Sequence, residues 1–124
     1  MRSTQSVSMW PVALVGGLRW EGPICENGKV IKFFTGWMPS RTFPVDMASF
    51  AFNIRLLFQN ENAYINPEVK RGYLESDFLE QLQIKVEDVE AKAEDCSKVC
   101  LQILVVSSSK TGIFKFFSYT SNQN

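Results

Sequence analysis

The sequence predicts an α/β fold from three features. A strand-rich segment opens the chain, a hairpin signal follows it, and apolar side chains then recur at helical spacing from Met47 and again from Leu74. Strands followed by helices suit a complete α+β domain or the back half of a larger α/β domain. We favour the second, because the first strand begins almost at Met1 and the tail after Val99 differs in composition from the chain before it.

The strand predictions come first along the chain. Residues 6–15 are rich in valine and tryptophan and predict one buried strand. Pro11 lies inside that run and has no N–H to donate, which predicts an edge position or a bulge. Residues 18–24 and 30–37 flank Asn27-Gly28, a dipeptide typical of a tight β-hairpin turn. A further apolar strand is expected at 99–106.

Three helical segments are expected between the hairpin and the last strand. Residues 47–58 carry apolar side chains at helical spacing, and Asp46 directly before them suits an N-cap. Residues 74–82 form a second amphipathic helix, and 86–93 a charged helix or helical turn. The polar segment 60–71 connects the first two helices.

Composition excludes several classes of function. The 124 residues suffice for one modest domain, and a formal net charge of +0 without a basic stripe argues against a nucleic-acid partner. The chain has no histidine, which removes Ser-His-Asp and Cys-His catalysis. Its three cysteines are an odd number, so any disulfide leaves one thiol over. No apolar run approaches the ~20 residues that span a membrane.

Candidate chemistry therefore rests on carboxylates, an arginine and tryptophans. Pro39 and Pro44 stiffen the loop that carries Arg41 and Asp46. Glu21, Asp46 and Glu75 are candidate general bases, and a helix N-terminus should favour the ionised form of the last two. Carboxylates accept hydrogen bonds from sugar hydroxyls, and a tryptophan face offers a platform for sugar C–H groups; three such residues are present, namely Trp10, Trp20 and Trp37.

Each of these residues also has an ordinary structural interpretation, and for any one alone that interpretation is the stronger. A helix N-terminus favours Glu75 and Asp77 for its own sake, Glu21 suits a strand surface, and tryptophans suit a core. No phosphate-binding glycine loop and no acidic pair with metal-ligand spacing is present in the sequence.

Three ordered motifs carry a resemblance to a known family. They are V-S-M-W-P-V-A-L-V-G-G-L-R-W-E-G-P at 7–23, P-S-R-T-F-P-V-D-M-A-S-F-A at 39–51, and R-G-Y-L-E-S-D-F-L at 71–79. Together they resemble the C-terminal half of the animal β-1,3-glucuronosyltransferases, closest to those acting on the proteoglycan linker. The resemblance implies a GT-A type fold, of which residues 1–99 would be the acceptor-binding half of a truncated domain. Residues 100–124 form a divergent tail without a family match.

The resemblance also assigns roles to residues. The family's catalytic base falls on Glu75 in G-Y-L-E-S. Its acceptor-sugar contacts fall on Glu21, Arg41 and Asp46, and the aromatic that stacks on the acceptor falls on Trp37. The implied reaction is inverting transfer of glucuronate to the 3-hydroxyl of a terminal galactose. Glu75 would take the hydroxyl proton, and the other residues would orient the sugar.

Partners, cofactor and location follow from the same resemblance. It implies UDP-glucuronate as donor, a galactose-terminated proteoglycan linker as acceptor, a homodimer, and a type II protein of the Golgi membrane. A manganese ion is implied on the donor diphosphate, with its ligand motif in the nucleotide half and no metal ligand in this chain. We therefore expect a fragment that cannot turn over alone. The alternative is a non-catalytic product of the same family that binds acceptor sugar or pairs with full-length subunits.

Overall fold

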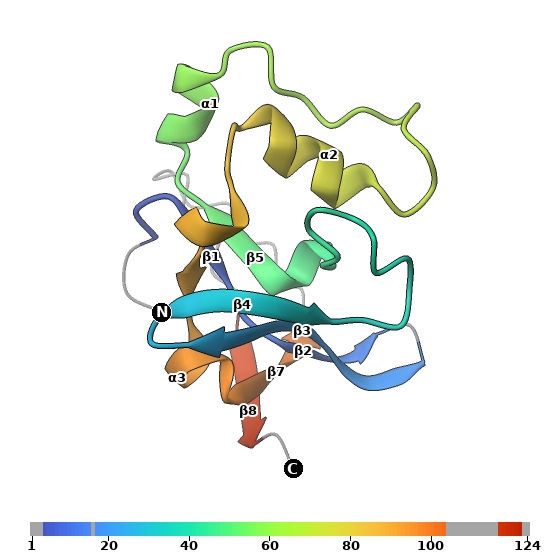
Figure 1. Ribbon diagram of the computed structural model, residues 1–124, viewed down its shortest axis with the longest axis vertical. Helices are drawn as coiled ribbons and strands as arrows, with labels where there is room; N and C mark the ends of the chain where they lie inside the picture. Colours follow the sequence, from blue (N-terminus) through green and yellow to red (C-terminus); the bar gives the residue numbers. More distant parts are fainter. Residues whose placement is uncertain (1–3, 16, 104–116, 123–124) are drawn as a thin grey trace.

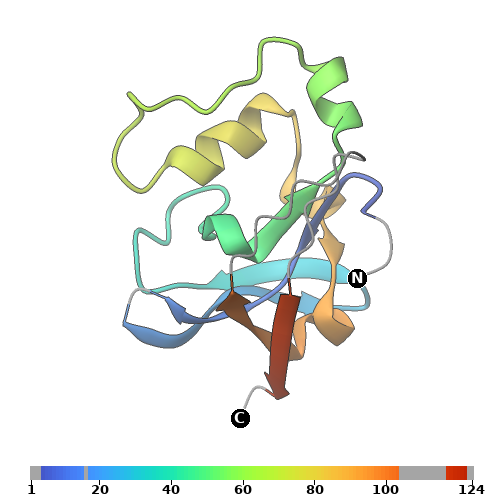
Figure 2. The ribbon, with the colours of Figure 1, turned by 180° about the vertical axis from the view of Figure 1, so that it is seen from behind.

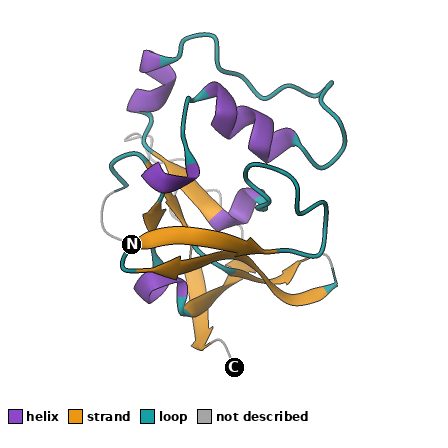
Figure 3. Ribbon diagram, in the orientation of Figure 1, coloured by secondary structure: helices purple, strands orange, loops and turns teal. Residues whose placement is uncertain are grey.

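The computed structural model describes residues 4–15, 17–103 and 117–122, and its strands cross the middle of the molecule (Figures 1 and 3). The described strands are β1 (Val7–Met9), β2 (Val12–Val15), β3 (Leu18–Glu26), β4 (Lys29–Phe34), β5 (Phe50–Phe52), β6 (Glu90–Ala91), β7 (Lys98–Ile103) and β8 (Phe117–Asn122). The described helices are α1 (Arg55–Gln59), α2 (Leu74–Gln81) and α3 (Ala93–Cys96), with 3-10 turns η1 (Met47–Ser49) and η2 (Val86–Asp88).

These strands form a mixed sheet in the order β5-β1-β6-β4-β3-β2-β7-β8. Two pairs, β1 with β6 and β2 with β7, are parallel, and the other pairs are antiparallel. Helices α1 and α2 lie together at one end of the molecule, and Figure 2 shows β7 and β8 at the other end. A mixed sheet with a few short helices confirms the predicted α/β class.

The single strand predicted at 6–15 is two strands, because Pro11 interrupts it. Its carbonyl accepts a hydrogen bond from the Cys100 N–H at 2.9 Å. After the break, β2 turns to pair with β3 and β7, whereas β1 pairs with β5 and β6. Gly22 passes so close that a Cβ on it would lie 2.6 Å from the Pro11 Cα. Pro11 therefore marks a change of pairing partners, which the sequence predicted only as an edge or a bulge.

The predicted hairpin is confirmed. Strands β3 and β4 pair antiparallel with Glu26 opposite Lys29. The two turn residues, Asn27 and Gly28, have φ of 52° and 78°. Positive φ at both central positions is the requirement that Asn-Gly meets most easily.

The long helix predicted at 47–58 is wrong. Asp46 does cap a helical turn, since its side chain accepts from the Ala48 N–H at 2.9 Å, but that turn is only η1. The chain then extends into β5, which pairs with β1. Helix α1 begins only at Arg55. Pairing with a distant strand offers the backbone a hydrogen-bonding partner that local apolar spacing does not reveal.

The second helix is confirmed as α2, and the segment predicted as a charged helix or turn contains only η2 before β6 begins. Phe78, Leu79 and Leu82 of the predicted second helix are buried and pack under the loop that follows β4.

The main core cluster consists of Val7, Met9, Val30, Phe43, Val45, Phe50, Phe78, Leu79, Leu82 and Val89. Since Phe43 and Val45 belong to this cluster, the loop between β4 and η1 is anchored to the core.

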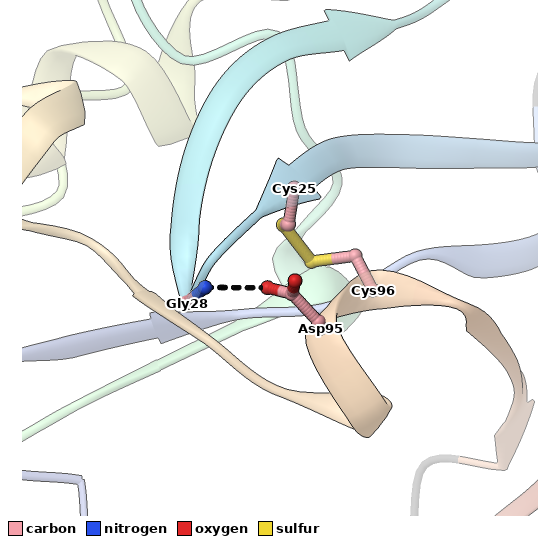
Figure 4. Close-up of a disulfide and its surroundings, with 4 residues drawn as sticks. All are labelled: Cys25, Gly28, Asp95 and Cys96. Atoms are coloured by element: carbon pink, nitrogen blue, oxygen red, sulfur yellow. Dashed lines mark hydrogen bonds between the residues drawn. A yellow bond between two sulfur atoms is a disulfide. The ribbon is translucent and has the colours of Figure 1, made fainter.

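A disulfide joins Cys25 in β3 to Cys96 in α3, across 71 positions of sequence (Figure 4). The third cysteine, Cys100, is buried and keeps its thiol. The residues of α3 have φ between 52° and 61°, so this turn is left-handed. The disulfide and a 2.8 Å hydrogen bond from the Gly28 N–H to Asp95 hold the turn in place. Each non-glycine residue in that conformation costs about 1–2 kcal/mol, so these ties offset local strain.

The strand predicted at 99–106 is observed as β7, whose described part ends at Ile103. Residues 104–106 and 107–116 of the predicted strand and tail lie outside the described residues. Within the described part of the chain, no helix has the length and apolar character needed to cross a membrane.

Candidate functional site

The site predicted from the sequence lies where three parts of the chain meet. These are the loop between β4 and η1, the first half of β3, which carries Glu21, and the N-terminal end of α2, which carries Glu75. In Figures 1 and 2 that loop runs directly beside the start of α2. A hydrogen bond of 3.1 Å from the Phe43 N–H to the buried Ser76 hydroxyl fixes the loop to the helix.

Arg41 is a buried side chain of the loop that makes three hydrogen bonds. It is only 8% exposed, and its guanidinium donates to three backbone carbonyls: Met38 at 3.1 Å, Gly72 at 2.8 Å and Trp37 at 2.6 Å. These bonds use three of the five guanidinium N–H groups, which leaves one on each terminal nitrogen for a ligand. Arg41 therefore joins the loop to the segment that enters α2.

Trp37 is the tryptophan that the structure leaves accessible. Its side chain is 51% exposed, whereas Trp10 is 2% exposed and belongs to a core cluster. The Trp20 ring packs on Phe34 with centroids 4.5 Å apart. Of the three tryptophans, only Trp37 thus combines exposure with a place beside Arg41.

Glu21 is buried at 5% exposure, although it carries a carboxylate. It accepts hydrogen bonds from the Thr35 hydroxyl at 2.9 Å and from the Gly36 N–H at 3.4 Å. The same Thr35 oxygen accepts from the Trp37 N–H at 3.2 Å. Glu21 is therefore connected to Trp37 through one hydroxyl group, and a surface-strand interpretation of Glu21 does not hold.

Glu75 and Asp46 lie close enough for their charges to interact. Burial is the largest influence and raises the pKa of Glu75, and the neighbouring Asp46 carboxylate raises it further. The Arg41 charge and the backbone N–H groups of Glu75 and Met47 act in the opposite direction and only partly offset burial. The expectation that the helix N-terminus favours the ionised form of Glu75 is therefore wrong in its net direction, because desolvation outweighs it.

The five predicted residues form one connected group. Glu21 reaches Trp37 through Thr35, Trp37 reaches Arg41 through a carbonyl, and the Arg41 and Asp46 charges both act on Glu75. A half-buried carboxylate with a raised pKa is a stronger base than an exposed one. An exposed indole beside it can pack on the C–H face of a sugar. The arrangement suits proton removal from a hydroxyl of a bound sugar.

Sequence reasoning missed three residues that hold this group together, namely Thr35, Gly72 and Ser76. Thr35 follows a strand and Ser76 lies in a helix, where a hydroxyl has no distinctive local signal. Gly72 stands three positions before the E-S pair of the third motif, and a glycine just ahead of a predicted helix is the one local signal for it. Its φ of +88° shows why glycine is suited there.

The resemblance implies a manganese ion on the donor diphosphate. Within residues 4–15, 17–103 and 117–122, no three side chains of the histidine, cysteine, aspartate or glutamate type gather in a metal-binding group. Divalent cations of this kind need several oxygen ligands. The described residues therefore offer no ligand set for that ion.

Comparison with known proteins agrees with the resemblance. The family model of glycosyltransferase family 43 matches residues 1–106. Galactosylgalactosylxylosylprotein 3-beta-glucuronosyltransferase 3 of Homo sapiens is 50% identical over 99 residues, which cover 80% of this chain and 29% of that protein. The Caenorhabditis elegans galactosylgalactosylxylosylprotein 3-beta-glucuronosyltransferase sqv-8 is 48% identical over 100 residues, covering 80% of this chain and 28% of that protein. The chain thus spans less than a third of the length of these relatives, and it belongs to glycosyltransferase family 43.

Proposed function

We propose that this chain supplies the acceptor-sugar side of a β-1,3-glucuronosyltransferase site in a GT-A type fold. The observation that carries the proposal is the connection of Glu75, Asp46, Arg41, Trp37 and Glu21 in one group. The relatives' names supply the substrate class, a linker of two galactoses and a xylose. The terminal galactose would lie on the Trp37 ring with its 3-hydroxyl toward Glu75.

Each residue has a part in the proposed reaction. Glu75 accepts the proton of the galactose 3-hydroxyl as that oxygen attacks the anomeric carbon of UDP-glucuronate. The bond between that carbon and the UDP oxygen breaks on the opposite side, so the configuration inverts and UDP leaves. Asp46 and Glu21 accept hydrogen bonds from sugar hydroxyls, and Arg41 donates one from a remaining N–H. These contacts hold the attacking oxygen in line and contribute proximity.

The family implies further properties that we include in the proposal. We place the protein on the lumenal side of the Golgi membrane, and the Cys25–Cys96 disulfide supports an oxidising compartment. A homodimer and a manganese ion on the donor diphosphate stay predictions. The isolated chain is expected to give no turnover, because it matches only 29% of the length of the Homo sapiens relative.

A transfer assay on a chimera tests the proposal. The chimera carries residues 1–99 of this chain in place of the matching segment of the Homo sapiens relative. We expect transfer from UDP-glucuronate to a galactosyl-galactose acceptor, lowered roughly 100- to 10,000-fold by Glu75→Gln. Glu80→Gln changes an exposed glutamate of the same helix and should leave the rate unchanged. Equal rates in the two variants would remove Glu75 from the role of base.

A second candidate function is sugar binding without turnover. The observation that favours it is that the whole connected group lies within this one chain, so acceptor binding would require no other segment. Such a product would compete for the acceptor or pair with longer subunits. Co-expression with the relative separates the two cases. Copurification of the two chains, or lowered transfer activity of the relative, supports the second candidate. The absence of both effects contradicts it.

A further inference from the structure

An exposed aromatic ring needs something to fix its position if it is to act as a platform. The backbone of Trp37 is held on both sides, by the Thr35 hydroxyl at its N–H and by Arg41 at its carbonyl. These bonds fix the main chain at residue 37. They do not fix the ring, which is half exposed.

The ring lies instead against the backbone at Gly72. A Cβ placed on Gly72 would lie 2.5 Å from Trp37 Nε1 and 3.3 Å from Trp37 Cδ1. A separation of 2.5 Å is far inside van der Waals contact, so the edge of the indole occupies the space that any other residue at 72 would need. The ring therefore lies against bare main chain.

The same guanidinium holds both sides of this contact. Arg41 donates to the Gly72 carbonyl at 2.8 Å and to the Trp37 carbonyl at 2.6 Å. Gly72 also stands three positions before Glu75, at the entry to α2. The ring and Glu75 are thus linked through Arg41 and the three residues from Gly72 to Glu75.

We propose that Gly72 is a positioning residue that sets where the Trp37 ring lies relative to Glu75. The inference rests on the proposed function, in which that ring receives the terminal galactose. A side chain at 72 would push the ring away, so that a sugar stacked on it would present its hydroxyl out of reach of the base. A misplacement of about 1 Å can lower the rate of a positioned reaction roughly 100-fold.

The test compares Gly72→Ala with a control of equal backbone strain. Gly17 has φ of +78°, close to the +88° of Gly72, and a Cβ on it would meet nothing within 4 Å. Both alanine variants carry the cost of a positive φ, but only the one at 72 collides with the indole. Any difference between them therefore reports the contact with Trp37.

The indole N–H signals in a ¹H–¹⁵N NMR spectrum of the full chain give the first measurement. Gly72→Ala should shift the signal of Trp37 and leave those of Trp10 and Trp20 unchanged, and Gly17→Ala should shift none. A galactosyl-galactose titration gives the second: affinity should fall roughly ten- to 100-fold in Gly72→Ala only. Identical Trp37 signals and affinities in the two variants would overturn the proposal.

The proposal stays testable if the wild-type chain binds no sugar or if Gly72→Ala does not fold. If the wild-type chain binds no sugar, the proposed function fails, and the indole signal still decides whether Gly72 positions the ring. If Gly72→Ala does not fold, the double variant with Trp37→Phe decides, because the smaller ring leaves room for the new methyl group. Recovery of folding supports the proposal, and continued failure overturns it.

Discussion

Replacing Arg41 by lysine keeps a positive charge at the site and removes the bridge between loop and helix. The guanidinium donates three hydrogen bonds, of 3.1, 2.8 and 2.6 Å, to carbonyls on three different residues. The ammonium group of lysine is a single point and cannot reproduce this fork. Hydrogen bonds that involve a charged group contribute about 1.5–3 kcal/mol each, which sets an upper bound of roughly 5–9 kcal/mol.

The expected loss is smaller than that bound, because water can reach part of the site. The Trp37 side chain is 51% exposed, and its neighbours in the loop are partly accessible, so water replaces some of the lost bonds. The loop also relaxes: Met38 has φ of +42°, a conformation that Arg41 holds through the Met38 carbonyl. We expect Arg41→Lys to lower the free energy of unfolding by about 3 kcal/mol.

Urea unfolding of the two proteins measures this difference. Arg55→Lys is the matched control, since Arg55 is exposed at the start of α1, and its change should stay within about 0.5 kcal/mol. If Arg41→Lys is as stable as Arg55→Lys but no longer binds the sugar, the guanidinium acts only as a ligand contact. That result would refute its role in holding the loop to α2.

Three further predictions concern charges and the disulfide. The pKa of Glu75 is raised in the folded protein, so the free energy of unfolding should fall as pH rises from 4.5 through the raised pKa. The Glu75→Gln variant should not show this fall. In urea unfolding at pH 7 it should be more stable than the wild type. For Glu90, burial acts to raise the pKa, but hydrogen bonds from the Ser6 N–H, the Lys92 ammonium, the Gln5 N–H and the Ser8 hydroxyl outweigh it and lower the pKa. Ionised Glu90 should therefore stabilise the fold above pH 4.5, and the free energy of unfolding should fall as pH drops below that value. In an acid titration, the Glu90→Gln variant should not show this fall. The Cys25–Cys96 disulfide closes a loop across 71 positions, so its reduction should lower the free energy of unfolding by about 4 kcal/mol. Thermal unfolding in the presence and in the absence of reductant measures this difference. An equal melting temperature under the two conditions would contradict a stabilising role for the disulfide.

Local signals predicted the elements that local physics controls. Asn27-Gly28 gave the hairpin turn, because both residues accept positive φ. Helix α2 followed from apolar spacing and a polar N-terminus. Residues 47–58 could not be assigned correctly, since β5 exists only through pairing with β1, about forty positions away.

The candidate site shows the same division. Residue type and placement singled out Glu21, Arg41, Asp46 and Glu75, because in a chain without histidine carboxylates are the candidate bases, and they also accept hydrogen bonds from sugar hydroxyls. The direction in which the Glu75 pKa shifts could not be predicted, because the shift depends on burial against a loop far away in sequence. Gly72 was missed for a similar reason: its importance lies in a contact with Trp37, 35 positions earlier.

The central claim is that this chain holds an acceptor-sugar site, and a titration with the galactose-galactose-xylose linker tests it most directly. In a ¹H–¹⁵N NMR spectrum of the full chain, the linker should shift the Trp37 indole signal and the amides around Glu75. Asp46→Asn and Glu21→Gln should abolish these shifts, whereas Glu80→Gln, at an exposed position of α2, should preserve them. A folded chain whose spectrum does not change with the linker, or changes equally in all three variants, would contradict the claim.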